Sequence, residues 1–112
     1  MSAYVPKQGD IIAITFDPQA GHEQKGRRPA LVVSKGLFNS STGLAIVCPI
    51  TNTDRGFPFH VPIPEISTLT GFVMVEQVKS VDFRARRVRR IERRNDELLS
   101  EVLSKLDACL YA

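Results

Sequence analysis

Short apolar runs, rich in β-branched residues, occupy much of the chain as far as residue 94. Each run has the length of a β-strand, and glycine, proline, asparagine or aspartate separates neighbouring runs. The runs predict strands at residues 11–16, 30–34, 44–50, 59–63 and 71–81, and at residues 88–94, whose spacing also suits a helical turn.

Details within these runs refine the prediction. Pro49 interrupts the third run and favours an edge position or a bulge, because proline cannot donate to a strand ladder. The run at residues 71–81 is long for one strand, and we expect it to bend. Residues 35–43, which include Asn39 and Gly43, have the composition of turns.

From Asn95 onward the apolar positions change to helical spacing. Asn95 can cap the helix, and the acidic Asp96 and Glu97 suit its first turn. The apolar positions are Leu98, Leu99, Val102, Leu103, Leu106 and Leu110. We therefore predict a mainly β fold with a C-terminal α-helix: a small antiparallel barrel or curled sheet whose open side the helix covers.

Composition limits the class of protein. A chain of 112 residues fits a single domain, here residues 1–112. Its 43% hydrophobic and 24% charged residues are near globular averages, so disorder is not indicated. The N-terminus lacks a signal-peptide core, and no apolar run approaches the roughly 20 residues that span a bilayer. We expect a soluble, cytoplasmic protein with no membrane partner.

The sequence gives no sign of a metal or cofactor. The chain has 2 cysteines, Cys48 and Cys109, which form no C-x-x-C pair and stand far from any histidine cluster. We expect both to be small buried apolar residues. Walker loops, nucleophile elbows and zinc spacings are also lacking in the sequence.

Arginine is concentrated in one stretch, although the net charge is only +3. Such a block suits a phosphate backbone or an acidic protein partner, and the alternative is a solvated face. The block comprises Arg84, Arg86, Arg87, Arg89, Arg90, Arg93 and Arg94.

Residues 18–34 place several reactive side chain types in one loop that runs into a strand. Arg28 precedes Pro29, so its backbone is biased toward extended geometry at the sheet end, where a guanidinium can grip phosphate. His22 and Glu23 are candidate proton acceptors. The alternative for Arg28 is a surface ion pair with Glu23.

Further candidates lie outside this loop. Thr51 follows the third predicted strand, where its hydroxyl can contact an oxyanion, although an isolated threonine is more often a turn residue. Glu76 shares a predicted strand face with Met74, so its carboxylate needs a partner or a wet groove, and Arg28 is a candidate partner. We place His60 on a solvated strand face without a role.

Several blocks of sequence, in order along the chain, resemble the MazF/PemK toxins of bacterial toxin-antitoxin modules. G-D, F-D-P, G-H-E-Q-x-G-x-R-P-A and P-I-T stand at residues 9–10, 16–18, 21–30 and 49–51. The likeness continues in F-N, G-F-P-F, E-Q-V-K-S and R-A-R at residues 38–39, 56–59, 76–80 and 84–86. It covers most of the chain.

The resemblance implies an SH3-like antiparallel barrel of the MazF/PemK/CcdB type and a homodimer. The implied activity is that of a metal-independent, sequence-specific endoribonuclease, an mRNA interferase that cuts single-stranded RNA and inhibits translation. It also implies a cognate MazE-like antitoxin and a cytoplasmic location. No cofactor is implied.

The same resemblance assigns site residues. Arg28 and Thr51 match family positions implicated in catalysis, and Glu23 is associated with the same site. Supporting or substrate-binding roles fall to His22, Gln24, Arg27, Glu76, Gln77, Arg84 and Arg86.

One branch, PemK or Kid, uses the loop histidine with an arginine and an aspartate of a later strand. His22 matches the histidine and Glu76 stands at the aspartate position, but Met74 replaces the strand arginine. The MazF-like assignment is therefore preferred.

The implied reaction is attack of a ribose 2′-hydroxyl on the adjacent phosphorus, which leaves a 2′,3′-cyclic phosphate and a 5′-hydroxyl. A guanidinium is a poor base, so we assign Arg28 to the phosphorane charge and Thr51 to a nonbridging oxygen. Glu23 or His22 then accepts the proton, a transfer worth roughly 10² to 10⁴ in rate.

Two other readings stay open. A CcdB-like toxin shares the architecture but binds gyrase, and fold alone cannot separate the two classes. The ribonuclease is favoured by the reactive side chains of the loop at residues 23–28, together with Thr51, and by the C-terminal C-L-Y-A, which lacks tryptophan. A non-catalytic RNA-binding barrel is the third reading, to be favoured if Arg28 and Thr51 prove dispensable.

Overall fold

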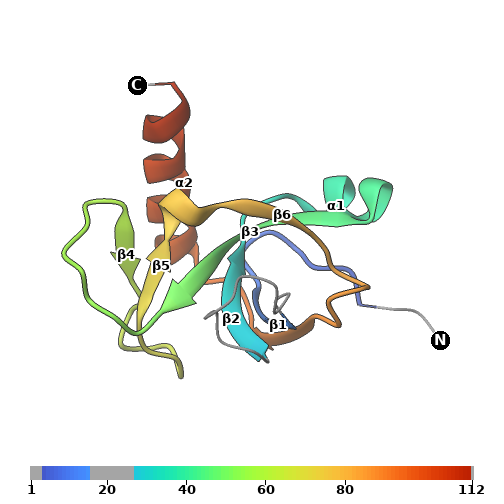
Figure 1. Cartoon of the computed structure of the whole chain (residues 1–112), viewed down its shortest axis with the longest axis horizontal. Helices are drawn as coiled ribbons and strands as arrows, with labels where there is room; N and C mark the ends of the chain where they lie inside the picture. The colour runs from blue at the N-terminus through green and yellow to red at the C-terminus, as the bar shows by residue number, and fades with distance from the viewer. Residues whose placement is uncertain (1–3, 16–26, 112) are drawn as a thin grey trace, which may run out of the picture.

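The computed structural model describes residues 4–15 and 27–111. They form a curled antiparallel sheet with a long helix beside it (Figure 1). The strands are β1 (Ile11–Thr15), β2 (Arg27–Val32), β3 (Leu44–Thr51), β4 (His60–Pro62), β5 (Phe72–Met74), β6 (Lys79–Asp82) and β7 (Arg89–Glu92). The helices are α1 (Gly36–Thr42), the short 3₁₀ helix η1 (Val75–Gln77) and α2 (Asp96–Leu110).

The strand order is β4-β5-β3-β2-β1-β7, and β6 adds to the outer side of β3. All printed pairs are antiparallel, and β4 and β7 stand at opposite ends of the order. The predicted mainly β fold with a C-terminal helix is therefore confirmed. The described strands curl in the manner of a barrel without closing into one.

Pro49 occupies a different position from the one expected. It pairs with Ala30 in the centre of the sheet, so the predicted edge position is wrong. On the other side of β3, the pairing with β6 ends at Val47 and that with β5 begins at Ile50. The proline that lacks an N–H thus lies where β3 changes partners, and no ladder bond is lost there.

The bend predicted within residues 71–81 is present. The run divides into β5 and β6, with η1 between them, and both strands pair with β3. Residues 88–94 contain β7, so the strand interpretation of that segment is correct.

Helix α1 replaces the turns expected at residues 35–43. Asn39 is fully buried, its side-chain amide donates to the Pro6 carbonyl at 2.8 Å, and Ser34 donates its hydroxyl to Asn39 Oδ1. Gly43 ends the helix with φ 77°, in the left-handed conformation that glycine favours. Tertiary hydrogen bonds therefore give a helix to residues that local preference assigns to turns.

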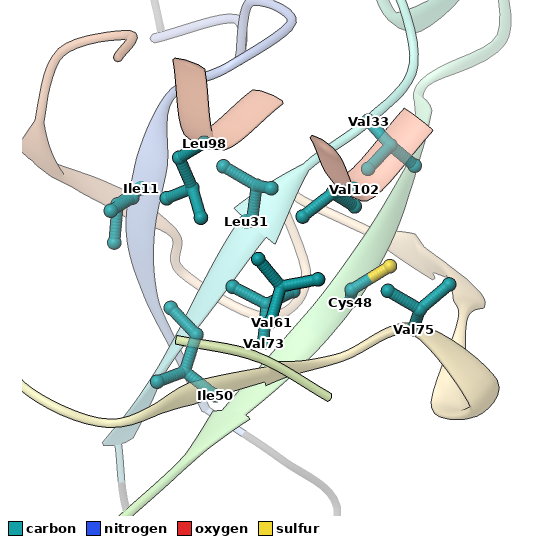
Figure 2. Close-up of a cluster of buried hydrophobic side chains, with 10 residues drawn as sticks. All are labelled: Ile11, Leu31, Val33, Cys48, Ile50, Val61, Val73, Val75, Leu98 and Val102. Carbon is teal, nitrogen blue, oxygen red and sulfur yellow. The ribbon is translucent and has the colours of Figure 1, made fainter. Parts of the chain in front are cut away.

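The sheet has apolar side chains on both faces. One cluster packs against α2, and Figure 2 shows Leu98 and Val102 of the helix over Leu31 of β2. A second cluster includes Ile12 and Phe83. The predicted cap of α2 is confirmed, because Asn95 Oδ1 accepts from the Leu98 N–H at 2.9 Å.

The cysteines differ from each other. Cys48 is buried in the cluster beneath α2, as expected, and burial raises the pKa of its thiol to about 12. Cys109 is exposed near the end of α2, so the expectation that both are buried is wrong for this residue. Residues 107–110 are all exposed, so the last turn of α2 extends beyond the apolar cluster and leaves Cys109 uncovered.

No helix in the described parts of the chain is long and apolar enough to cross a bilayer.

Candidate functional site

Arg28 and Thr51 meet at the same end of the sheet. Arg28 lies in β2, Thr51 ends β3, and the pairing of these strands includes Ala30 opposite Pro49. The described pairing ends at Ala30 and Pro49, and extending its register by two residues sets Arg28 opposite Thr51. The two candidates, from separate sequence blocks, therefore lie at the same end of two neighbouring strands.

Both side chains are half-buried and available to a ligand. Arg28 makes no hydrogen bond or ion pair with any residue that the structure describes. The Thr51 hydroxyl oxygen accepts from the Thr53 N–H at 3.2 Å, and this bond leaves its own O–H free to donate. A cation and a hydroxyl donor at one sheet end suit an anionic group such as phosphate.

A pocket of about 330 Å³ adjoins Arg28. Its lining is mainly polar and combines cationic, amide and hydroxyl groups with a small apolar floor. The lining residues are Arg27, Arg28, Pro29, Ile50, Asn52, Thr68, Leu69 and Thr70. The sequence interpretation missed Asn52, Thr68 and Thr70, because isolated polar residues between strands look like ordinary loop residues.

The far wall of this pocket is held by hydrogen bonds. Ser67 donates its hydroxyl to Glu92 Oε1 at 2.6 Å, and the Thr68 N–H donates to Oε2 at 2.7 Å. The hydroxyls of Ser67 and then Thr68 hold the pKa of the Glu92 carboxyl below its ordinary value. Sequence reasoning also missed Glu92. The one hint in the sequence is that this acidic residue ends an arginine-rich strand.

Arg27 has structural partners. Its guanidinium donates to Thr15 Oγ1 and to the Ala13 carbonyl, each at 3.0 Å, and also to the Arg87 carbonyl. These bonds tie β2 to β1 and to the turn that precedes β7. Arg27 thus lines the pocket with a side chain that already binds the fold, whereas Arg28 has no such partner among the described residues.

Glu76 and His60 form a pair that corrects two expectations. Glu76 lies in η1, where the chain leaves strand geometry, so its predicted place on a strand face is wrong. Its carboxylate lies 2.9 Å from His60 Nε2, so the described partner of Glu76 is His60 and not Arg28. His60 is buried, with 3% of its side chain exposed, and was wrongly expected on a solvated face.

The remaining supporting candidates lie elsewhere. Gln77 is exposed in η1, and Arg84 stands over the Phe83 ring at 5.5 Å. Arg86 donates to the Thr15 carbonyl at 3.4 Å, so part of the basic block anchors the turn after β6. None of these three lines the Arg28 pocket. His22, Glu23 and Gln24 lie outside the described residues.

Metal ligands do not gather in the described ranges: no group of three or more His, Cys, Asp or Glu side chains is placed to hold an ion there. The fold and the pocket define a small, mainly β protein with a polar site at one sheet end, suited to an anionic ligand.

Comparison with known proteins identifies the family. Residues 7–110 match the model of the family described as PemK-like, MazF-like toxin of type II toxin-antitoxin system. The chain is 42% identical over 86 residues to the endoribonuclease toxin MazF of Escherichia coli strain K12, covering 77% of each protein. It therefore belongs to the PemK-like, MazF-like toxin family.

Solved structures agree with this assignment. MazF of Deinococcus radiodurans superposes with a TM-score of 0.88 at 41% identity, covering 98% of this chain and 100% of that one. A MazE-MazF structure from the same organism gives a TM-score of 0.88 at 42% identity, covering 96% and 97% of the two chains.

Proposed function

We propose that this chain is an endoribonuclease toxin that cleaves single-stranded RNA, chiefly messenger RNA, and thereby inhibits translation. Residues 1–112 act as a single toxin domain in the cytoplasm. The family assignment supports the activity, since the E. coli relative is named an endoribonuclease toxin. The observation that carries the proposal is the guanidinium of Arg28, which has no hydrogen-bond or ion-pair partner among the described residues, lines a polar pocket and lies at the same sheet end as Thr51.

The two side chains have complementary roles in the proposed reaction. The ribose 2′-oxygen loses its proton and attacks the neighbouring phosphorus, the bond to the 5′-oxygen of the next nucleotide breaks, and that leaving oxygen gains a proton. Arg28 neutralises the charge on the phosphorane-like transition state, and Thr51 donates its hydroxyl to a nonbridging oxygen. The products carry a 2′,3′-cyclic phosphate and a 5′-hydroxyl.

The nucleophile belongs to the substrate, so the reaction has no need of a metal-activated water. Glu23 or His22 accepts the proton from the 2′-hydroxyl, because a guanidinium is already protonated and has no free site to accept a proton. Glu76 is left out of this step, since its carboxylate is engaged by His60.

A cognate MazE-like antitoxin and a homodimeric state complete the proposal. The antitoxin is supported by the similarity to a MazE-MazF structure, in which the related toxin is seen with MazE. A gyrase-binding toxin is disfavoured by the family match, and a non-catalytic RNA-binding barrel remains the outcome to test against.

The test is cleavage of labelled, mixed-sequence single-stranded RNA by purified protein in EDTA. The wild type is expected to cut and to leave ends that a kinase labels directly at the 5′-hydroxyl. Arg28→Ala is expected to lose roughly 10² or more in rate, and Arg28→Lys to retain only part, because lysine lacks the planar fork. Equal cleavage by wild type and Arg28→Ala contradicts the proposal.

A further inference from the structure

Residues 68–70 line the pocket together with Arg28, and one carboxylate binds Thr68 and the preceding Ser67. Glu92 accepts hydrogen bonds from the Ser67 hydroxyl and from both the N–H and the hydroxyl of Thr68. The Ser67 oxygen in turn accepts from the Leu69 N–H at 3.0 Å. A loop of polar residues is thereby fixed from a neighbouring strand.

An irregularity in β7 aims Glu92 at this loop. Glu92 pairs with Ile11, whereas Arg90 pairs with Ile12, so Ile91 is an extra residue between them. Consecutive residues of β1 face opposite sides of the sheet, and paired residues share a side. The register shift therefore turns Glu92 away from the side of Arg90 and onto the side of Ile11.

The other end of the segment is fixed against β3. Thr70 donates its hydroxyl to Asn52 Oδ1 at 3.1 Å, beside Thr51. Gly71 has φ 126°, and a Cβ added there would lie 2.5 Å from the Thr51 carbonyl oxygen. The segment thus lies so close to the end of β3 that only glycine fits at residue 71.

These contacts leave a defined set of groups for a ligand. The bond from Thr70 occupies the oxygen of Asn52, so the two amide N–H groups of Asn52 remain as donors. Leu69 and Ile50 supply apolar surface, and Arg28 supplies positive charge. Together these groups match a nucleotide. The amide donors suit acceptors on a base edge or ribose, the cation suits a phosphate, and the apolar surface suits the flat ring of a base.

We propose that the pocket lined by Arg28, Asn52 and residues 68–70 is a subsite for one nucleotide of RNA next to the cleaved phosphate, and that Glu92 is the positioning residue that holds residues 67 and 68 in place. The subsite rests on the proposed function for the identity of the ligand. Asn52 contacts the nucleotide directly, whereas Glu92 acts through Ser67 and Thr68.

The experiment compares Glu92→Gln and Asn52→Ala with the wild type. A glutamine offers one acceptor oxygen and cannot serve donors on both sides as the carboxylate does. Glu65→Gln is the matched control, because Glu65 is exposed near the same loop, undergoes the same charge change and has no partner in the described chain. Cleavage is measured with a short RNA containing a mapped site, and binding with the same RNA carrying a 2′-deoxy group at the cleaved position.

Glu92→Gln and Asn52→Ala are each expected to raise KM and the Kd of the uncleavable RNA by about threefold to tenfold, as for one misplaced hydrogen-bonding contact, with kcat nearly unchanged. Partial unfolding would lower the active fraction and kcat but leave KM unaltered. Unchanged KM and Kd in both variants, or an equal rise in Glu65→Gln, overturns the proposal. Should Glu92→Gln fail to fold, Asn52→Ala decides the outcome.

Binding to a mixed-sequence RNA pool separates this inference from the proposed function. If the wild type binds the pool but does not cut it, the ribonuclease proposal fails while a loss of binding in Asn52→Ala still supports the subsite. If the wild type cuts RNA and both variants bind and cut as it does, only the subsite is wrong.

Discussion

Glu76 Oε2 lies 2.9 Å from His60 Nε2, where η1 packs beside β4. His60 is buried against Phe57, with 5.0 Å between the ring centroids, and its Nδ1 has no hydrogen-bond partner. Among the described residues, Glu76 is thus the hydrogen-bond partner of His60 Nε2. Neither residue lines the Arg28 pocket. We therefore expect the pair to support the fold and to take no part in the proposed chemistry.

Replacing Glu76 with alanine is expected to reduce stability more than activity. The change leaves a buried imidazole without its partner, which costs about 1–3 kcal/mol in the free energy of unfolding. Urea unfolding measures that loss, and kcat/KM for RNA cleavage should stay within about twofold of the wild type at temperatures where the variant is folded. A stable variant with a cleavage defect as large as that of Arg28→Ala would place Glu76 in the active site.

The neighbours Arg27 and Arg28 should separate stability from activity. Arg27→Ala removes three hydrogen bonds to β1 and the turn before β7, and we expect it to lose about 1–3 kcal/mol of unfolding free energy. Arg28→Ala removes no described bond and should change that free energy by less than about 0.5 kcal/mol. Paired urea curves for the two variants check this, and the opposite order of stabilities would be incompatible with the structure.

Gly71→Ala tests the close approach of the pocket wall to β3. The added methyl group would lie 2.5 Å from the Thr51 carbonyl oxygen, at φ 126°. We expect a loss of more than about 2 kcal/mol in unfolding free energy from clash and backbone strain together, with reduced RNA cleavage because Thr51 must move. Gly56→Ala is the control, since Gly56 has φ 67° and open space around its Cβ position. That control should cost only about 1–2 kcal/mol and leave cleavage intact.

The hydrogen bonds to Glu92 predict a pH-dependent contribution to stability. They hold the folded-state pKa of its carboxyl below the ordinary value of 4.5, so the folded state binds the proton less readily than the unfolded state. The stabilisation is fully present above that ordinary value and is lost as pH falls through the lower folded-state pKa. The difference in unfolding free energy between wild type and Glu92→Gln should therefore shrink on acidification below about pH 4.5. A difference that is constant from pH 7 to pH 3 would show that ionisation of Glu92 contributes nothing.

The sequence was sufficient where local chemistry decides the structure. Asn95 caps α2 because its short side chain reaches the Leu98 N–H, and that signal is visible in the sequence. Arg28 and Thr51 could be named because the resemblance gave both blocks, and the structure sets them at the same end of the neighbouring strands β2 and β3. The bend in residues 71–81 followed from a run too long for one strand.

The errors arose where distant contacts override local preference. Asn39 looks like a turn residue, but its buried bond to the Pro6 carbonyl supports α1. The role of Glu92 depends on a register shift beside Ile91, which no periodicity reveals. His60 alternates with apolar neighbours and so looked solvated, yet η1 brings Glu76 to it from a later segment.

The most direct test of the central claim is the single-turnover cleavage rate of one mapped RNA site in EDTA, for the wild type and Arg28→Ala at equal folded concentration. We expect the wild type to give a 2′,3′-cyclic phosphate and a 5′-hydroxyl, and the variant to be slower by roughly 10² or more with an unchanged unfolding curve. Cleavage by the folded variant at the wild-type rate would contradict the assignment of Arg28 to the active site.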